Sequence, residues 1–256
     1  MDKVKGIREK LNSMADIIRD TNHVIDDMAE ALEEIANELA DACAGQGGET
    51  AGPIKGFAWA SKRLRHGIVP TPGEIITTRL TDGIVAKWRV IDTQTMAELG
   101  GIQPIVVQLA EILDYRPFST PDKAHPWGWN NYEASSLASW VDGDFIKRLA
   151  DDDRACIVPR FDLGKPKDGS ALWLLSAEEV GFGDPDRAFD WYACEDEDER
   201  ARRRQLKDSD GDAAYWWLRT PNSGYASYVR YVDTSGALYD SGAVHSNGVA
   251  PACIIG

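Results

Sequence analysis

The first 42 residues place apolar side chains at alternating steps of three and four, which is the heptad pattern of a coiled coil. The a positions are Val4, Leu11, Ile18, Ile25, Leu32 and Leu39, and the d positions are Ile7, Met14, Thr21, Met28, Ile35 and Ala42. A single amphipathic surface helix rarely keeps a 3.5-residue period for so long. The pattern therefore predicts a coiled-coil oligomerisation helix over residues 1–44.

The positions that flank the a and d stripe favour an assembly of three or more chains. A dimer seam usually carries charges there, but this chain also has apolar residues, namely Ile17, Val24, Ala29, Ala31 and Ala36. We expect a homotrimer, with Thr21 as a polar d residue that helps to set the register. A dimer, or a helix that packs on its own globular domain, remains an alternative.

A stretch rich in glycine, "AGQGGETAGP", follows the helix and predicts a linker over residues 45–56. Residues 57–256 are expected to form one domain. Within it, Glu74–Gln94 has two β-rich runs around Asp82 and Gly83 and predicts a hairpin. The apolar run Ile105–Leu109 predicts a buried strand.

Three further segments carry helix signals. Apolar residues at helical spacing between Ser135 and Ala150 predict a helix, interrupted by Gly143. Ser176 and Glu179 have the spacing of a capping box, so a helix is expected to begin after the short strand near Trp173. Residues 195–204, "EDEDERARRR", place acids four residues before arginines, as in a solvated surface helix.

The C-terminal segment is expected to contain several short strands joined by glycine turns. The turn signals are Asn222–Gly224, Asp233–Gly236, Ser241–Gly242 and Asn247–Gly248. Short strands do not alternate with long helices, so a parallel α/β sheet is excluded and the fold class is α+β.

Charge and cysteine content narrow the classes of function. The net charge of −14 disfavours nucleic acid and anionic membranes as partners. The four cysteines have no C-x-x-C spacing and are expected to be free thiols in a reducing compartment. The N-terminus lacks an apolar signal core, and no apolar run is long enough to span a membrane. We expect synthesis in the cytoplasm without a signal peptide. If the protein acts outside a cell, we expect it to leave by lysis or as part of a particle such as a virion.

A series of motifs resembles a bacterial and phage domain family of unassigned function. The series is "AKWRVID", "IVVQLA", "WGWNNYEASSLASWVDGDFIKRL", "ALWLLSAEEV", "YWWLRTP" and a closing "GVAPACII". The resemblance covers about residues 73–256, and its W-W-L-R-T-P to G-V-x-P-A bracket is the most specific part. This chain departs from the family pattern at Ala250 and Ala138, where arginine is common. The family's closing motif has arginine at the position of Ala250, so any ligand-binding role of that arginine does not apply to this chain.

The family is similar in architecture to C-type-lectin-like domains, which include the variable proteins of diversity-generating retroelements and the formylglycine-generating enzymes. The resemblance implies a C-type-lectin-like domain behind the N-terminal coiled-coil helix. An oxidase of the formylglycine type would need a close pair of metal-binding cysteines and a Gly-Gly-Ser-Trp signature, and the sequence offers neither.

No cofactor or metal is expected, and no motif of a known catalytic site occurs. Asp208–Asp212, "DSDGD", has the carboxylate spacing that calcium prefers, but Arg219 stands where a bidentate Glu would follow. We interpret this stretch as an ordinary acidic loop, with a calcium site as the alternative.

The segment from Tyr215 to Gly256 combines a rigid-looking frame with a mixture of Tyr, Ser, Asn, Asp, His and Arg. Antibody binding loops use a similar mixture, because tyrosine gives a large contact area at a low entropy cost. The candidate ligand-binding residues are Tyr225, Tyr228, Arg230, Tyr231, Asp233, Tyr239, Asp240, His245 and Asn247. The frame residues, expected to be buried, are Trp216, Trp217, Val232, Gly236, Val249 and Pro251.

Retroelement diversification rewrites adenines, and changes at the adenines of Asn codons give the residue types that dominate this segment. The prediction is a non-enzymatic receptor-binding or adhesin-like protein with a variable C-terminal surface, whose partner is a protein or glycan on a cell surface. Two alternatives stay open: an enzyme that uses a pocket of the fold, and a structural phage particle protein.

Overall fold

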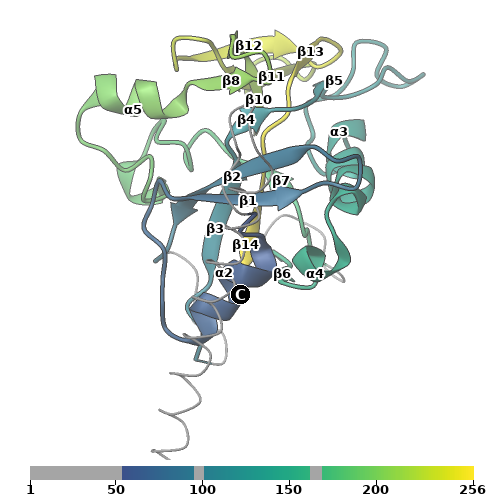
Figure 1. Ribbon diagram of the computed structural model, residues 1–256. Helices are drawn as coiled ribbons and strands as arrows, with labels where there is room; N and C mark the ends of the chain where they lie inside the picture. The colour runs from purple at the N-terminus through teal and green to yellow at the C-terminus, as the bar shows by residue number, and fades with distance from the viewer. Residues whose placement is uncertain (1–53, 95–100, 162–168) are drawn as a thin grey trace, which may run out of the picture. The chain divides into compact units, whose positions relative to one another are not determined.

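The computed structural model describes residues 54–94, 101–161 and 169–256 (Figure 1). Contacts within the chain divide it into Met1–Pro53 and Ile54–Gly256, and the second unit contains all the elements described below. The predicted coiled coil of residues 1–44 and most of the predicted linker lie outside the described residues. Within the described residues, no helix is long and apolar enough to cross a lipid bilayer.

The unit is mixed α+β, with most of its ordered residues in sheets and few in helices, so the predicted fold class is confirmed at this level. The strands of the first sheet lie in the order β1 (Ile75–Arg79), β2 (Val85–Asp92), β3 (Ile105–Leu109), β14 (Pro251–Ile255) and β6 (Ile157–Val158), and β7 (Trp173–Leu174) also pairs with β14. The last strand of the chain thus lies inside this sheet, antiparallel to β3. Both β3 and β14 are buried along their whole length, and Gln108 on β3 is the one residue of the two strands with a polar side chain.

The second sheet holds most of the C-terminal segment and lies toward the upper end of the view in Figure 1. Its strands lie in the order β12 (Leu238–Gly242), β11 (Tyr228–Val232), β10 (Trp216–Pro221), β13 (Ser246–Gly248) and β5 (Tyr115–Pro117). A third, small sheet consists of β4 (Glu111–Ile112), β8 (Leu206–Asp208) and β9 (Ala213–Ala214).

The helices are short. They are α2 (Phe57–Arg65), α3 (Ser136–Trp140), a π-helical turn (Val141–Phe145), a 3₁₀ turn (Ile146–Arg148), α4 (Asp151–Arg154), a second 3₁₀ turn (Pro185–Arg187) and α5 (Glu197–Arg204). The core between helices and sheets is rich in aromatic side chains. Trp88, for example, packs edge-on against Phe57 and Phe145 and donates its indole hydrogen bond to Thr78.

Several sequence predictions are confirmed. β1 and β2 form the predicted hairpin, with Gly83 at φ +91° in the turn. The apolar positions of the predicted helix after Ser135 point into the core, but only its first part is α-helical, and Gly143 lies in the π-helical turn. α5 forms as predicted, with Asp196 as its N-cap and Glu199 paired with Arg203.

Two predictions are wrong in detail. Ser176 and Glu179 exchange the two hydrogen bonds of a capping box, but the chain turns away after one turn and no helix follows. The carboxylate of Glu179 is shared with the buried arginine network described below, which holds this turn in place. Asn247 and Gly248 form part of strand β13 instead of a turn, because Gly248 pairs with Trp216 and Tyr115.

Candidate ligand-binding surface

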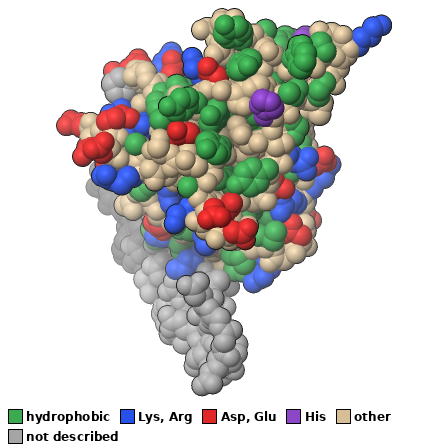
Figure 2. All heavy atoms as spheres, turned by 90° about the horizontal axis from the view of Figure 1, so that it is seen from above, with side chains coloured by type: hydrophobic (Ala, Val, Ile, Leu, Met, Phe, Trp, Pro, Cys, Tyr) green, Lys and Arg blue, Asp and Glu red, His purple; other side chains and the backbone are tan. Residues whose placement is uncertain are grey.

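The exposed Tyr and Trp side chains gather on the second sheet and its loops. Every exposed Tyr and Trp among the described residues comes from this region: Tyr115, Trp127, Tyr215, Tyr225, Tyr228 and Tyr239. We call these six residues the aromatic surface. Figure 2 views the side of the unit that carries β12 and β13, and hydrophobic side chains form several separate clusters there among uncharged side chains and backbone. Tyr and Trp are the residue types that are enriched in binding hot spots.

The loop that carries Tyr225 is held rigidly. The Asn130 side chain is buried, and its amide nitrogen lies 3.0–3.1 Å from the carbonyl oxygens of Asn222, Tyr225 and Tyr228. Asn222 in turn accepts hydrogen bonds from the backbone N–H groups of Gly224 and Tyr225. Tyr225, with 67% of its surface exposed, is therefore presented on a fixed backbone beside Tyr228, whose ring centroid is 5.6 Å away.

Strand alternation divides the candidate residues of β11 and β12 between two faces of the sheet. Tyr231 and Tyr239 lie opposite each other on one face, and their rings stack at 6.3 Å. Arg230 and Asp240 lie opposite each other on the other face and form an ion pair at 2.5 Å. The predicted residues therefore do not make one continuous face.

Tyr231 belongs as much to the core as to the surface. Its ring packs edge-on against Trp217 at 6.2 Å and against Tyr215 at 5.8 Å. Burial, followed by the nearby side chains Tyr215 and Asp233, raises the pKa of Tyr231 above its ordinary value. The exposed members of this cluster are Tyr215 and Tyr239.

Two other candidates, Asp233 and His245, have local partners. Asp233 accepts hydrogen bonds from the backbone of Ser235 and Ala237 and from the Ser235 hydroxyl, so it closes the β11–β12 turn. Although partial burial raises it, these hydrogen bonds hold the pKa of Asp233 below its ordinary value. His245 is exposed, and its Nδ1 lies 3.0 Å from the Ser241 hydroxyl.

Asn247 lies next to Arg116, which was not among the predicted site residues. It lies opposite Arg116 on β5, and both Asn247 Nδ2 and Arg116 Nε are buried without a hydrogen-bond partner. The Arg116 guanidinium stacks 3.8 Å above the Trp140 ring. No sequence signal marked Arg116, because its neighbours come from β13 and α3.

The loop between β5 and α3 was also missed. It brings Trp127, at 73% the most exposed large hydrophobic side chain of the described residues, toward the loop of Tyr225, and His125 stacks on Trp129 at 4.6 Å. A cavity of about 470 Å³ is lined by both loops, including His125, Trp127 and Tyr225. The sequence "HPWGWNNY" of this loop is rich in aromatic residues, and this composition could have indicated a binding loop.

The frame beneath this surface is buried as predicted. Trp216 and Trp217 have no exposed surface, and their indole nitrogens donate to the carbonyl oxygens of Arg204 and Arg116. Val232, Gly236, Val249 and Pro251 are buried as well. Ala250 and Ala138, where arginine is common in the resembled family, lie in the same buried interior.

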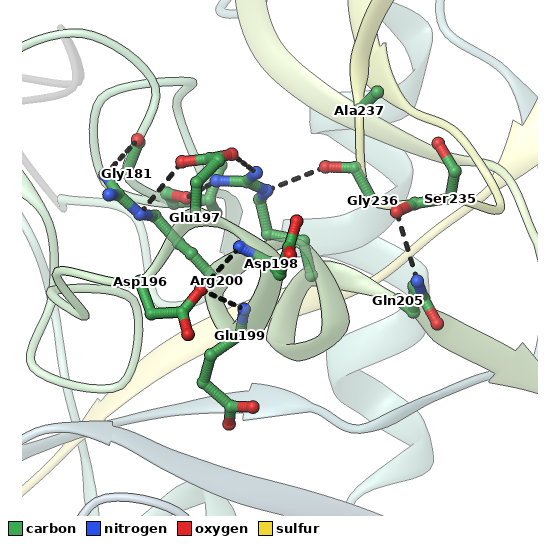
Figure 3. A network of polar contacts seen from close by, with 12 residues as sticks. Gly181, Asp196, Glu197, Asp198, Glu199, Arg200, Gln205, Ser235, Gly236 and Ala237 are labelled. Atoms are coloured by element: carbon green, nitrogen blue, oxygen red, sulfur yellow. Dashed lines mark hydrogen bonds and ion pairs between the residues drawn. The ribbon is translucent and has the colours of Figure 1, made fainter.

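Helix α5 supports the frame from the side, and Figure 3 shows its polar contacts. The fully buried Arg204 donates from Nε to the Gly236 carbonyl oxygen at 2.8 Å and pairs with Glu197. Gln205 donates to the Ser235 carbonyl oxygen at 3.1 Å. Gly236 has φ +85°, and a Cβ there would lie 2.1 Å from the Ala201 carbonyl oxygen, so only glycine fits. The predicted solvated helix is thus a packed element that fixes the β11–β12 turn.

In the acidic loop Asp208–Asp212, the first carboxylate is occupied by hydrogen bonds from neighbouring residues. Asp208 accepts hydrogen bonds from the backbone N–H groups of Asp210 and Asp212 and from the Tyr115 hydroxyl. In the described part of the chain, no three His, Cys, Asp or Glu side chains are arranged to hold a metal ion. The described cysteines, Cys156, Cys194 and Cys253, are free thiols.

Comparison with known proteins places the chain in a family. Residues 109–256 match the family described as "Domain of unknown function (DUF6273)", and because the match spans more than half of the chain, the chain belongs to this family. The matched region includes the second sheet and the whole aromatic surface. No curated protein and no solved structure matches the chain.

Proposed function

We propose that this chain is a non-enzymatic ligand-binding protein that docks a protein or glycan of a cell surface on its aromatic surface. The observation that carries the proposal is the concentration of all exposed Tyr and Trp side chains of the described residues on one sheet and its loops. Tyr and Trp dominate binding hot spots, because they bury a large area while losing few rotamers.

The second argument for a binding surface is that the residues beneath it hold it rigidly. Asn130 and Asn222 hold the Tyr225 loop, and the buried pair Trp216 and Trp217 holds β10. A preorganised surface loses little entropy on binding. The exposed residues can change while the buried frame is retained, which is what a variable binding surface needs.

The fold and setting are part of the proposal. We assign the unit to the C-type-lectin-like class and regard it as a diversity-generating retroelement target of phage or bacterial origin. A sheet that joins early and final strands, and a second sheet with long loops, support this assignment. Residues 1–44 would form a trimeric coiled coil that presents three copies of the surface, so that weak single sites add by avidity.

Binding to intact bacterial cells and to a glycan array tests this function. We expect the full-length protein to bind, and expect Tyr225→Ala and Tyr239→Ala to lose at least about tenfold in affinity, as for hot-spot tyrosines. Arg187→Gln, a change at an exposed arginine on another segment, is the control and should bind as the parent does. Unchanged binding by both tyrosine variants would remove the aromatic surface as the site.

A further inference from the structure

A second cavity lies between the first sheet, the third sheet and the end of α5, and none of the six residues of the aromatic surface lines it. It has a volume of about 570 Å³, which suits a small molecule. Four cations line it, namely Lys87, Arg89, Arg202 and Lys207, against two anions, Glu111 and Asp208. This positive balance stands out in a chain whose net charge is −14.

The two anions of the cavity already have partners. Glu111 pairs with Lys87 at 3.4 Å, across β4 and β2. Asp208 accepts hydrogen bonds from Asp210, Asp212 and Tyr115, as described above. Arg202 pairs outside the cavity lining, with Glu199 at 2.9 Å. The side chains of the remaining cations, Arg89 and Lys207, have no hydrogen bond or ion pair to any described residue.

Arg89 is held in a fixed position without a counter-charge. Its guanidinium lies 4.8 Å from the centre of the Trp191 ring, and Arg203 lies over the same ring at 4.6 Å. Arg203 has Glu199 as a partner at 3.0 Å, whereas Arg89 has none. Arg89 is half-buried, and a bound anion would offset its charge.

Two residues that pack next to Arg89 have unused donors, although they do not line the cavity. Arg89 Nε, Gln108 Nε2 and Trp191 Nε1 are all buried without a hydrogen-bond partner. Gln108 lies opposite Arg89 on the neighbouring strand β3, and its side-chain oxygen already accepts a hydrogen bond from Tyr192. Of these three residues, Arg89 lines the cavity, and its planar guanidinium suits a phosphate or carboxylate group.

We propose that this cavity binds a small molecule through a phosphate or carboxylate group, with Arg89 and Lys207 as its two charged contacts. Arg89 would bind the group through its planar fork of N–H donors, and the exposed Lys207 would add a mobile point charge at the mouth. This site is separate from the aromatic surface, so the two proposals stand or fall independently.

Isothermal titration calorimetry of the full-length protein at low ionic strength tests the site. The probes are inorganic phosphate and citrate, titrated separately, so that the preferred oxyanion is identified. We expect saturable binding of at least one probe at one site per chain. Lys207→Gln and Arg89→Gln should each weaken it about tenfold or more, because each removes a charge-assisted contact.

Lys147→Gln is the matched control, because Lys147 is an exposed lysine outside the cavity, paired with Asp144. It should bind as the parent does. Lys207 is exposed, so its variant keeps the test valid even if Arg89→Gln lowers the melting temperature. The proposal is overturned if neither probe binds saturably, if Lys207→Gln binds as the parent does, or if the control weakens binding equally.

Discussion

Tyr231 and Tyr239 lie directly opposite each other on β11 and β12, and their rings stack with centroids 6.3 Å apart. The two tyrosines have different neighbours: Tyr231 packs on the buried Trp217, whereas Tyr239 is 55% exposed. One ring is therefore a support and the other is available to a ligand. This difference decides which tyrosines a binding experiment should change.

Replacing Tyr231 by alanine should destabilise the unit, whereas replacing Tyr225 should not. We expect Tyr231→Ala to lower the free energy of unfolding by about 2 kcal/mol, because it removes packing against Trp217 and Tyr215. Tyr225→Ala should stay within about 0.5 kcal/mol of the parent, as for other exposed positions. Urea unfolding measures both. Equal losses in the two variants would contradict the division into support and contact residues.

The buried carboxylate of Glu179 is predicted to support the fold only above acid pH. Arg219 donates two hydrogen bonds to it and Arg160 donates one at 2.7 Å, inside the core. Burial alone would raise the pKa of Glu179, but the hydrogen bonds and charges of Arg219 and Arg160 hold it below the ordinary value of 4.5. The stabilisation is therefore present above that value and is lost as the pH falls through the lower folded-state pKa.

Glu179→Gln should lower the free energy of unfolding by about 3 kcal/mol at neutral pH, because it removes the buried negative charge that pairs with the largely buried guanidinium groups of Arg160 and Arg219. The deficit should shrink as the pH falls below about 4.5. Glu178→Gln is the control, since Glu178 is an exposed neighbour that pairs with Arg187. The prediction fails if both variants unfold alike at neutral pH, or if the Glu179→Gln deficit does not change with pH.

Alanine substitutions at two glycines distinguish the cost of a steric clash from the cost of the left-handed backbone conformation. Gly236 and Gly83 both have positive φ, but a Cβ at Gly236 would collide with Ala201, whereas one at Gly83 meets nothing within 4 Å. Gly83→Ala should cost about 1 kcal/mol from the left-handed conformation alone. Gly236→Ala should cost at least about 2 kcal/mol more, because α5 must move. Similar thermal unfolding of the two variants would show that α5 does not fix the β11–β12 turn.

The coiled coil proposed for residues 1–44 predicts how truncation changes the assembly. The compact unit begins at Ile54, so a chain of residues 54–256 should fold and remain monomeric. The full-length chain should be a trimer by light scattering. A monomeric full-length chain would exclude the coiled-coil trimer and with it the argument from avidity.

Sequence periodicity was sufficient to predict the elements in which apolar and polar residues alternate or recur at a regular spacing. The β1–β2 hairpin, β3, α5 and the buried frame around Trp216 were predicted because their burial follows from neighbouring positions. The helix expected after Ser176 was wrong, because a long-range contact decided it: Glu179 bonds to Arg219 on β10, which the local capping signal does not contain.

The candidate site was predicted only in outline for the same reason. The sequence marked the C-terminal segment, but it did not reveal that Arg230 and Asp240 neutralise each other on one face, or that Asp233 closes a turn. Trp127 and Arg116 come from a distant part of the chain. The pairing of β5 with β13 brings Arg116 into the second sheet, and the hydrogen bonds of Asn130 join the loop of Trp127 to that of Tyr225. These contacts depend on which strands pair and in which register. Neither can be read from a single sequence.

Deep sequencing of the final codons of this gene across a natural population tests the variable binding surface most directly. The account predicts substitutions at adenine-containing codons, concentrated at exposed positions such as Tyr225, Tyr228, Tyr239 and His245. Trp216, Trp217, Gly236 and Pro251 should stay constant, because the frame is buried. A uniform segment, or variation spread equally over frame and surface, would contradict the claim that a diversified surface is displayed on a fixed support.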